Sequence, residues 1–178
     1  MSLYEMVAAQ CVFANQGVYN RPTAITRIED RNGNVIYEYV EDNWEVYNEN
    51  VAFEVVQMMK KVMNEGTGAS LRNGANPWGG IPHIMAGKTG TAQANYGTNG
   101  GADKHYISSF VGYFPADLPK YSCIVVVHNP DSSNNNYYGA DVAGPVFKRI
   151  AQKIFTDSPT KNIVKNLDLK NSNQEKNK

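Results

Sequence analysis

The sequence lacks both an excess of one charge and any long apolar run. Its 17 basic and 17 acidic residues give a formal net charge of zero, so charge gives no sign of nucleic-acid binding or of attraction to a membrane surface. The longest aliphatic run, Ile124 to Val127, is far shorter than the roughly 20 residues of a membrane-spanning helix. The first residues also lack the basic and then apolar order of a signal peptide. We therefore expect any export or anchoring signal to lie outside this chain.

Cysteine and histidine are scarce. The two cysteines, Cys11 and Cys123, are too few for a disulfide scaffold and fall in apolar segments, which predicts buried free thiols. The histidines stand singly, with no cysteine or carboxylate at metal-ligand spacing; they are His83, His105 and His128. We expect neither a metal site nor a cofactor.

The composition and the apolar pattern of the sequence predict one soluble α+β domain over residues 1–155. The 178 residues are 42% hydrophobic and 19% charged, which is enough to bury a core. Apolar periodicity and turn signals predict helices over 3–14, 48–66 and 139–155, a hairpin over 23–40 centred on Asn32-Gly33, and strands over 84–92, 106–114 and 121–128. This order predicts an antiparallel sheet with flanking helices.

Each predicted helix carries an apolar stripe that is expected to face the core. The stripes are Leu3, Val7, Gln10/Cys11 and Ala14; Val51, Val55, Met58/Met59 and Val62; and Val142, Val146, Ile150 and Ile154. Asn48 and Asp141 are the expected N-caps of the second and third helices. The strand at 121–128 is expected to be covered on both faces, and residues 156–178 to form a polar linker or disordered tail.

The string MAGKTGTAQ, residues 85–93, places Lys88 among glycines and threonines. A nucleotide-binding P-loop would need a glycine where Pro82 stands, and a helix that begins at the lysine. The residues after Thr91 are rich in glycine and asparagine and do not start a helix. The pattern therefore argues against a phosphate-binding loop.

A strand is the better interpretation of this string. With a period of two, Lys88, Gly90 and Ala92 point to one side, and Thr89 and Thr91 to the other. A cation, hydroxyls and glycine at an open strand edge suit a ligand that has a carboxylate and pairs through its own peptide group. A structural strand with a solvated lysine is the alternative that these residues alone leave open.

The surroundings of this strand resemble a known family. AGKTGTAQ is followed by SSFVGYFPADLPKYSCIVVV and YYGADVAGPVFKRIAQKIF, and together they resemble the C-terminal part of a penicillin-binding protein transpeptidase domain. These segments are most similar to the monofunctional, division-associated class. The upstream ITRIEDRNGNVIYE is more similar to the bifunctional class, so both classes stay open. The resemblance covers residues 2–155.

The resemblance implies part of a penicillin-binding, β-lactamase-like fold, and acyl transfer on peptidoglycan stem peptides that end in D-Ala-D-Ala. It implies that Lys88 sustains the electropositive network around a serine nucleophile, and that the hydroxyls of Thr89 and Thr91 bind the terminal carboxylate. The Thr91 amide is expected to form half of an oxyanion hole, and Gly90 to permit close approach. The implied partners are stem peptides, β-lactams and cell-wall synthesis proteins. The implied location is the extracytoplasmic face of the inner membrane in the bacterial envelope.

The family's serine motifs are not found where they are expected. Ser-x-x-Lys and Ser-x-Asn should precede the Lys-Thr-Gly strand, and the sequence before Lys88 has neither. Downstream, SPTK at 158–161 and SSN at 132–134 spell the patterns, but their surroundings predict a tail and a turn. We interpret the chain as the C-terminal half of the domain. We expect it to expose an apolar sheet face and apolar helix stripes, to aggregate or pair with the missing N-terminal half, and to be unable to acylate alone.

Two functions without transpeptidation remain as alternatives on the same fold. A β-lactam or muropeptide sensor would keep the nucleophile but lose the transfer step. An interaction module would be a stable monomer without an exposed apolar face. The sequence that precedes Met1 and its flanking domains would discriminate the sensor.

Overall fold

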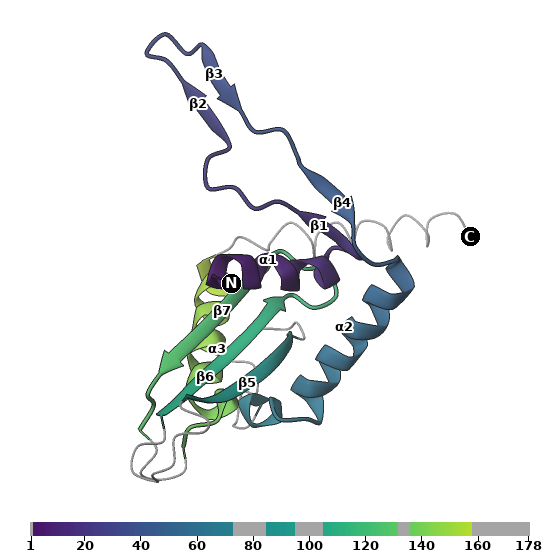
Figure 1. Ribbon diagram of the computed structural model, residues 1–178, viewed down its shortest axis with the longest axis vertical. Coiled ribbons are helices and arrows are strands. Elements are labelled where there is room, and N and C mark those ends of the chain that lie inside the picture. Colours follow the sequence, from purple (N-terminus) through teal and green to yellow (C-terminus); the bar gives the residue numbers. More distant parts are fainter. Residues whose placement is uncertain (1, 73–84, 95–104, 132–135, 158–178) are drawn as a thin grey trace, which may run out of the picture.

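The computed structural model describes residues 2–72, 85–94, 105–131 and 136–157, which form helices and antiparallel strands (Figure 1). The α+β prediction is therefore confirmed. The helices are α1 (Leu3–Ala14), α2 (Glu49–Asn64) and α3 (Gly139–Asp157), with a 3-10 turn η1 (Ala69–Arg72). The strands are β1 (Val18–Asn20), β2 (Arg27–Glu29), β3 (Val35–Glu38), β4 (Asn43–Glu45), β5 (Ala86–Ala94), β6 (His105–Phe114) and β7 (Tyr121–His128).

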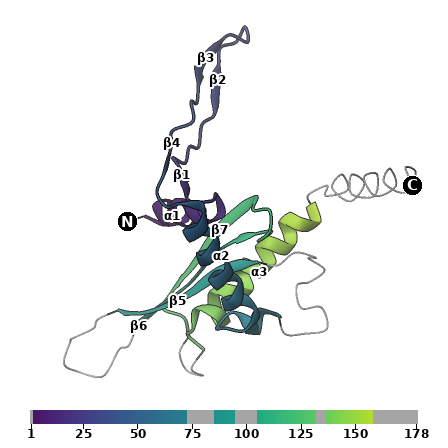
Figure 2. The ribbon, with the colours of Figure 1, turned by 90° about the vertical axis from the view of Figure 1, so that its right-hand side faces the viewer.

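The central sheet is antiparallel and has the strand order β5-β6-β7. The strands lie between α1 and α3, which contact opposite faces (Figure 2). Both helices contact β7, as expected, but its side chains from Ser122 to Val127 are only half-buried, because β7 stands at the edge of this sheet. Cys11 on α1 and Cys123 on β7 are free, half-buried thiols, and burial raises the pKa of Cys123.

A projecting arm joins α1 to α2 (Figure 1). The predicted hairpin is confirmed as β2 paired with β3, and the Asp30 carboxylate closes its turn by accepting the backbone N–H groups of Asn32 and Asn34, each at 2.8 Å. A second ribbon, β1 paired with β4, forms the base of the arm. The sequence did not predict this ribbon, because strands of three residues are too short to show alternation.

The helix ends follow capping rules, with one difference from the prediction. Ser2 and Glu5 form a capping box at α1, and the Asn48 side chain caps α2 as expected. α3 already begins at Gly139, so Asp141 lies in its first turn and is not its N-cap. A carboxylate in the first turn still stabilises the helix, because it interacts favourably with the positive end of the helix dipole. At the other end α3 runs to Asp157, and the rest of the predicted tail lies outside the described residues.

The predicted apolar stripes coincide with the buried helix faces only in part: Met59 is buried, and Ala14, Val55 and Ile154 pack against the core clusters. The apolar side chains that the helices bury are those of Ala8, Val12, Ala52, Met59, Met63, Ala140, Ala143, Phe147 and Ala151. Alanines where the helices contact the sheet let the helix backbones approach it closely. The larger aliphatic side chains of the predicted stripes therefore lie beside this contact. Val51 and Met58 are 45% and 59% exposed, and Val146 is 41% exposed.

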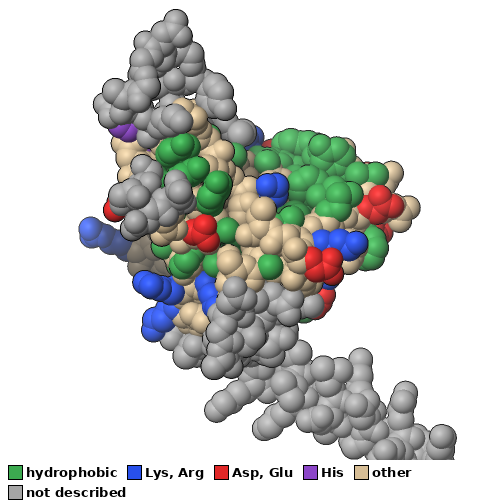
Figure 3. All heavy atoms as spheres, turned by 90° about the horizontal axis from the view of Figure 1, so that it is seen from below, with side chains coloured by type: hydrophobic (Ala, Val, Ile, Leu, Met, Phe, Trp, Pro, Cys, Tyr) green, Lys and Arg blue, Asp and Glu red, His purple; other side chains and the backbone are tan. Residues whose placement is uncertain are grey.

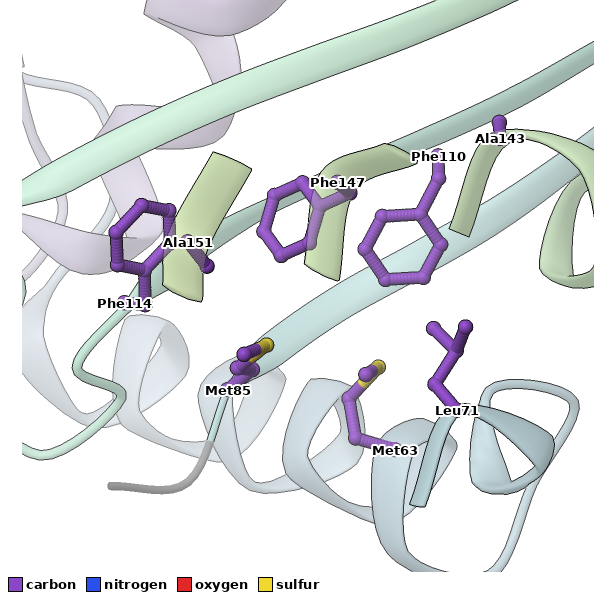
Figure 4. Close-up of a cluster of buried hydrophobic side chains, with 8 residues drawn as sticks. All are labelled: Met63, Leu71, Met85, Phe110, Phe114, Ala143, Phe147 and Ala151. Atoms are coloured by element: carbon purple, nitrogen blue, oxygen red, sulfur yellow. The ribbon is translucent and has the colours of Figure 1, made fainter. Parts of the chain in front are cut away.

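α2 contributes to the hydrophobic clusters on both faces of the sheet. On the α3 side, Met63 packs in one cluster with Phe110 and Phe147, whose ring centroids lie 4.7 Å apart (Figure 4). On the other side, Met59 packs with Tyr113. These contacts fix α3 to the face of the sheet and α2 along β5, and they hold the beginning of β5 between the two helices.

Large apolar side chains are nevertheless exposed on the helices. Leu3 and Tyr4 of α1 are each 53% exposed, and Phe53 of α2 is 61% exposed. Apolar side chains gather on the right-hand side of Figure 3, the side on which α2 lies in Figure 1. The expected exposure of apolar helix surface is thus observed. The expected exposed sheet face is not, because Tyr121 is the one large apolar residue of the described central strands that is exposed. Within the described part of the chain, no helix combines the length and apolarity needed to cross a bilayer.

Candidate functional site

The Lys-Thr-Gly stretch lies where β5 leaves the core. Met85 and Ala86, at the start of the strand, are fully buried, whereas Lys88 and Thr91 are exposed and Thr89 is half-buried. Among the described strands, β5 pairs only with β6. From Lys88 onward, the strand therefore presents an edge with backbone groups and polar side chains that a ligand can reach.

The pairing of β5 with β6 determines which side chains share a face. Thr89 stands opposite Phe110, and Thr91 stands opposite Ser108. Directly opposite residues in an antiparallel pair lie on the same face, and Phe110 packs against α3, so both threonines are on the α3 face. Lys88 is on the other face. The alternation predicted from the sequence is therefore confirmed.

The Lys88 ammonium lies against its own strand. Its Nζ donates a hydrogen bond of 2.7 Å to the Thr89 carbonyl oxygen. Among the described residues, the ion pairs involve other basic side chains, and no carboxylate pairs with Lys88. An exposed cation without a carboxylate partner in the described part of the chain favours an anionic ligand.

The Thr89 hydroxyl is held by a threonine from another element. The Oγ1 atoms of Thr67 and Thr89 lie 2.9 Å apart. Thr67 belongs to the turn that ends α2, where the backbone N–H groups of Gly66 and Gly68 each donate to a carbonyl of the last helical turns at 3.0 Å. The backbone on both sides of Thr67 is thus fixed, and α2 places its hydroxyl beside β5.

The Thr91 hydroxyl is held by the first residue of α3. The Gly139 N–H donates to Thr91 Oγ1 at 3.1 Å. A Cβ atom at Gly139 would lie 2.6 Å from the Gly90 carbonyl oxygen and 2.2 Å from the Ser109 carbonyl oxygen. Only glycine fits at this position, so α3 begins in direct backbone contact with the Lys-Thr-Gly stretch.

Sequence reasoning identified Lys88, Thr89 and Thr91 but missed Thr67 and Gly139. Thr67 is 22 residues from Thr89 and Gly139 is 48 residues from Thr91, so no local pattern joins them. The sequence contains two weak signals for these residues: a threonine between glycines directly after a helix, and a glycine at the start of the last helix. The two serine motif matches, SPTK at 158–161 and SSN at 132–134, lie outside the described residues.

The fold is that of transpeptidase domains. Penicillin-binding protein 3 from Mycobacterium tuberculosis is 31% identical with a TM-score of 0.68, and the match covers 88% of this chain and 35% of that one. A peptidoglycan synthetase from Bifidobacterium adolescentis is 25% identical with a TM-score of 0.69, and the match covers 88% and 27%. The prediction of a partial transpeptidase fold is confirmed.

The chain belongs to the penicillin binding protein transpeptidase domain family, which it matches over residues 1–152. Penicillin-binding protein PbpB of M. tuberculosis is 32% identical over 153 residues, covering 85% of this chain and 22% of that protein. Peptidoglycan D,D-transpeptidase FtsI of Buchnera aphidicola is 32% identical over 110 residues, covering 62% and 18%. The chain spans about a fifth of the length of these relatives.

Proposed function

We propose that this chain supplies the Lys-Thr-Gly wall of the active site of a peptidoglycan D,D-transpeptidase. One observation carries the proposal: consecutive residues of β5 present the exposed Lys88 cation, which has no carboxylate partner among the described residues, and on the other face of the strand the hydroxyls of Thr89 and Thr91, which other elements hold in place. Family membership supports it. FtsI of B. aphidicola is named a peptidoglycan D,D-transpeptidase, and penicillin-binding protein 3 of M. tuberculosis, 32% identical, has been solved in complex with aztreonam.

The proposed reaction consists of two acyl transfers. A serine hydroxyl attacks the penultimate carbonyl of a stem peptide ending in D-Ala-D-Ala, the peptide bond breaks, and D-Ala leaves with the proton on its amine. An amine of a second stem peptide then attacks the resulting ester, forms a new peptide bond and restores the serine hydroxyl. A β-lactam carbonyl takes the place of the scissile peptide, and its ring-opened ester persists on the serine.

Each residue of the stretch has a role in this proposal. The hydroxyls of Thr89 and Thr91 donate to the terminal carboxylate of the substrate, in charge-assisted hydrogen bonds. The Thr91 backbone N–H donates to the oxyanion that forms at the attacked carbonyl. The Lys88 ammonium stabilises the negative charge that develops around the serine. Gly90 leaves the strand edge open to the substrate backbone.

The serine itself is proposed to come from a segment that precedes this sequence in the domain. The residues before Lys88 contain neither family serine motif, and the relatives are about five times as long as the matched part. The exposed apolar side chains of α1 and α2, including Leu3 and Phe53, are the surface against which that segment packs. The proposed location is the extracytoplasmic side of the bacterial inner membrane, where other cell-wall synthesis proteins are partners.

The test uses a completed domain, which is this chain joined in one polypeptide to an upstream segment that carries Ser-x-x-Lys and Ser-x-Asn. Fluorescent penicillin is expected to label the upstream serine of the completed domain and to leave this chain alone unlabelled. A stable adduct on Ser158 of this chain would contradict the proposal. Release of D-Ala from a stem peptide in the presence of an amine acceptor separates a transpeptidase from a sensor, because a sensor acylates without transfer.

A further inference from the structure

We propose that Thr67 and Gly139 are positioning residues, which direct the hydroxyl protons of Thr89 and Thr91 toward the carboxylate of the ligand. The inference rests on the proposed function, in which these two hydroxyls bind that carboxylate. It adds two residues that do not contact the substrate and act through the threonines.

At Thr91 the direction of the hydrogen bond is fixed. A backbone N–H can only donate, so the contact of 3.1 Å between Gly139 and Thr91 makes the threonine oxygen the acceptor. A hydroxyl that accepts in this way keeps its proton for another partner. Because Thr91 is exposed, that partner can be a ligand at the edge of β5.

At Thr89 we assign the same direction. A hydroxyl pair such as Thr67 and Thr89, 2.9 Å apart, can be formed with either oxygen as the donor. When Thr67 donates, Thr89 becomes an acceptor like Thr91, and its proton is free. Thr89 and Thr91 are two residues apart on one face of the strand, so the two free protons are presented side by side. Two adjacent O–H donors match the two oxygens of one carboxylate.

α3 supports both positioning residues. Its first residue is Gly139, and further along the Lys148 ammonium donates to the Leu71 carbonyl oxygen of η1 at 2.6 Å. A Cβ atom at Gly144 would lie 2.8 Å from the Leu71 side chain, so the helix and η1 are closely packed. The turn that carries Thr67 directly precedes η1, and one rigid helix therefore sets the spacing of both hydroxyl contacts.

Two measurements test this inference with the pair Thr67→Val and Thr67→Ser. The first is the threonine methyl NMR spectrum of this chain alone, in which Thr67→Val should move the Thr89 signal and Thr67→Ser should leave it close to its original position. The control is Thr23→Val in the arm, where the hydroxyl bonds only to Ile25 among the described residues. It should leave the Thr89 and Thr91 signals unchanged.

The second measurement is the acylation rate of the completed domain by a penicillin and by the same penicillin with its carboxylate esterified. For Thr67→Val, the rate with the free carboxylate should fall about three- to tenfold, the size expected for the loss of one neutral hydrogen bond, and Thr67→Ser should restore it. The rate with the ester should be the same for all variants. A purely structural role would slow both ligands equally.

Three results would overturn the inference. They are an unmoved Thr89 signal in Thr67→Val, an equal loss with both ligands, and a failure of Thr67→Ser to restore the rate. If the completed wild-type domain is not labelled at all, the proposed function fails, and the spectrum of this chain alone still decides whether Thr67 holds Thr89.

Discussion

A methyl group added at Gly139 should separate α3 from the Lys-Thr-Gly strand. In Gly139→Ala, the new Cβ atom would lie 2.2 Å from the Ser109 carbonyl oxygen and 2.6 Å from the Gly90 carbonyl oxygen, which is 1.2 and 0.8 Å short of the 3.4 Å at which ordinary contact begins. Both obstacles are backbone atoms of paired strands, so the helix start must move away. A displacement of this size breaks the hydrogen bond of 3.1 Å to Thr91.

The cost of this displacement can be measured by thermal unfolding of the chain. Overpacking of this kind costs about 1–3 kcal/mol, which corresponds to roughly 2–12 °C in Tm for a domain of this size. The Thr91 methyl signal should move in the same variant. Val146→Ala is the matched control on α3, because Val146 is 41% exposed and its truncation should change the free energy of unfolding by less than about 0.5 kcal/mol. A Gly139→Ala variant with wild-type Tm and an unmoved Thr91 signal would refute the reasoning.

Three further predictions concern the scaffold. Phe147→Ala should lower the free energy of unfolding by about 3–5 kcal/mol in urea titrations, because this fully buried ring packs against Phe110 and Phe114; a loss below 1 kcal/mol would contradict the assigned core. Burial raises the pKa of Tyr113 to about 12 from 10.0. Because the folded pKa is the higher one, the stability that the protonated Tyr113 contributes is fully present below pH 10 and is lost as the pH rises toward 12, by roughly 2–3 kcal/mol at most; Tyr113→Phe should remove this part of the pH dependence of Tm. Lys60→Ala should cost no more than about 1 kcal/mol, because its partner at 2.6 Å, Asp117, is 62% exposed.

The sequence was sufficient to predict the order and type of the main elements. Long periodic segments and the Asn32-Gly33 turn carry strong local signals, so the helices, the hairpin and the strands of the central sheet are found close to their predicted positions. The alternation of Lys88, Thr89 and Thr91 was also predictable, because a strand has only two faces. The short strands β1 and β4 carry no such signal.

The buried face of each helix could not be predicted from hydrophobicity alone. The prediction placed the bulkiest aliphatic row against the sheet, whereas rows that contain alanine make the contact, as with Ala52 in α2 and Ala143 in α3. Which row of helix residues is buried depends on how closely the helix can approach the sheet, and tertiary packing determines that distance. The exposed remainder, such as Met58, is consistent with a domain in which a further segment covers these helices.

The contacts of the site were unpredictable for a related reason. Thr67 and Gly139 reach Thr89 and Thr91 only because α2, η1 and α3 meet at the edge of β5. In the proposed function, the residues that contact the ligand lie close together on one strand. The residues that hold them in place are far from that strand in the sequence. A motif therefore reveals the former and a structure is needed for the latter.

The central claim, that Lys88 belongs to the wall of an acyl-transfer site, is tested most directly by the acylation of the completed domain with fluorescent penicillin. Lys88→Ala should lower the second-order acylation rate by about 10²- to 10⁴-fold, the range typical of a group that assists proton transfer or stabilises developing charge. The Tm should stay within a few degrees of wild type, because Lys88 is exposed and its described hydrogen bond is to the adjacent Thr89 carbonyl. A Lys88→Ala variant that acylates at the wild-type rate, or that unfolds while the remaining folded fraction stays active, would show that Lys88 is only a structural strand residue.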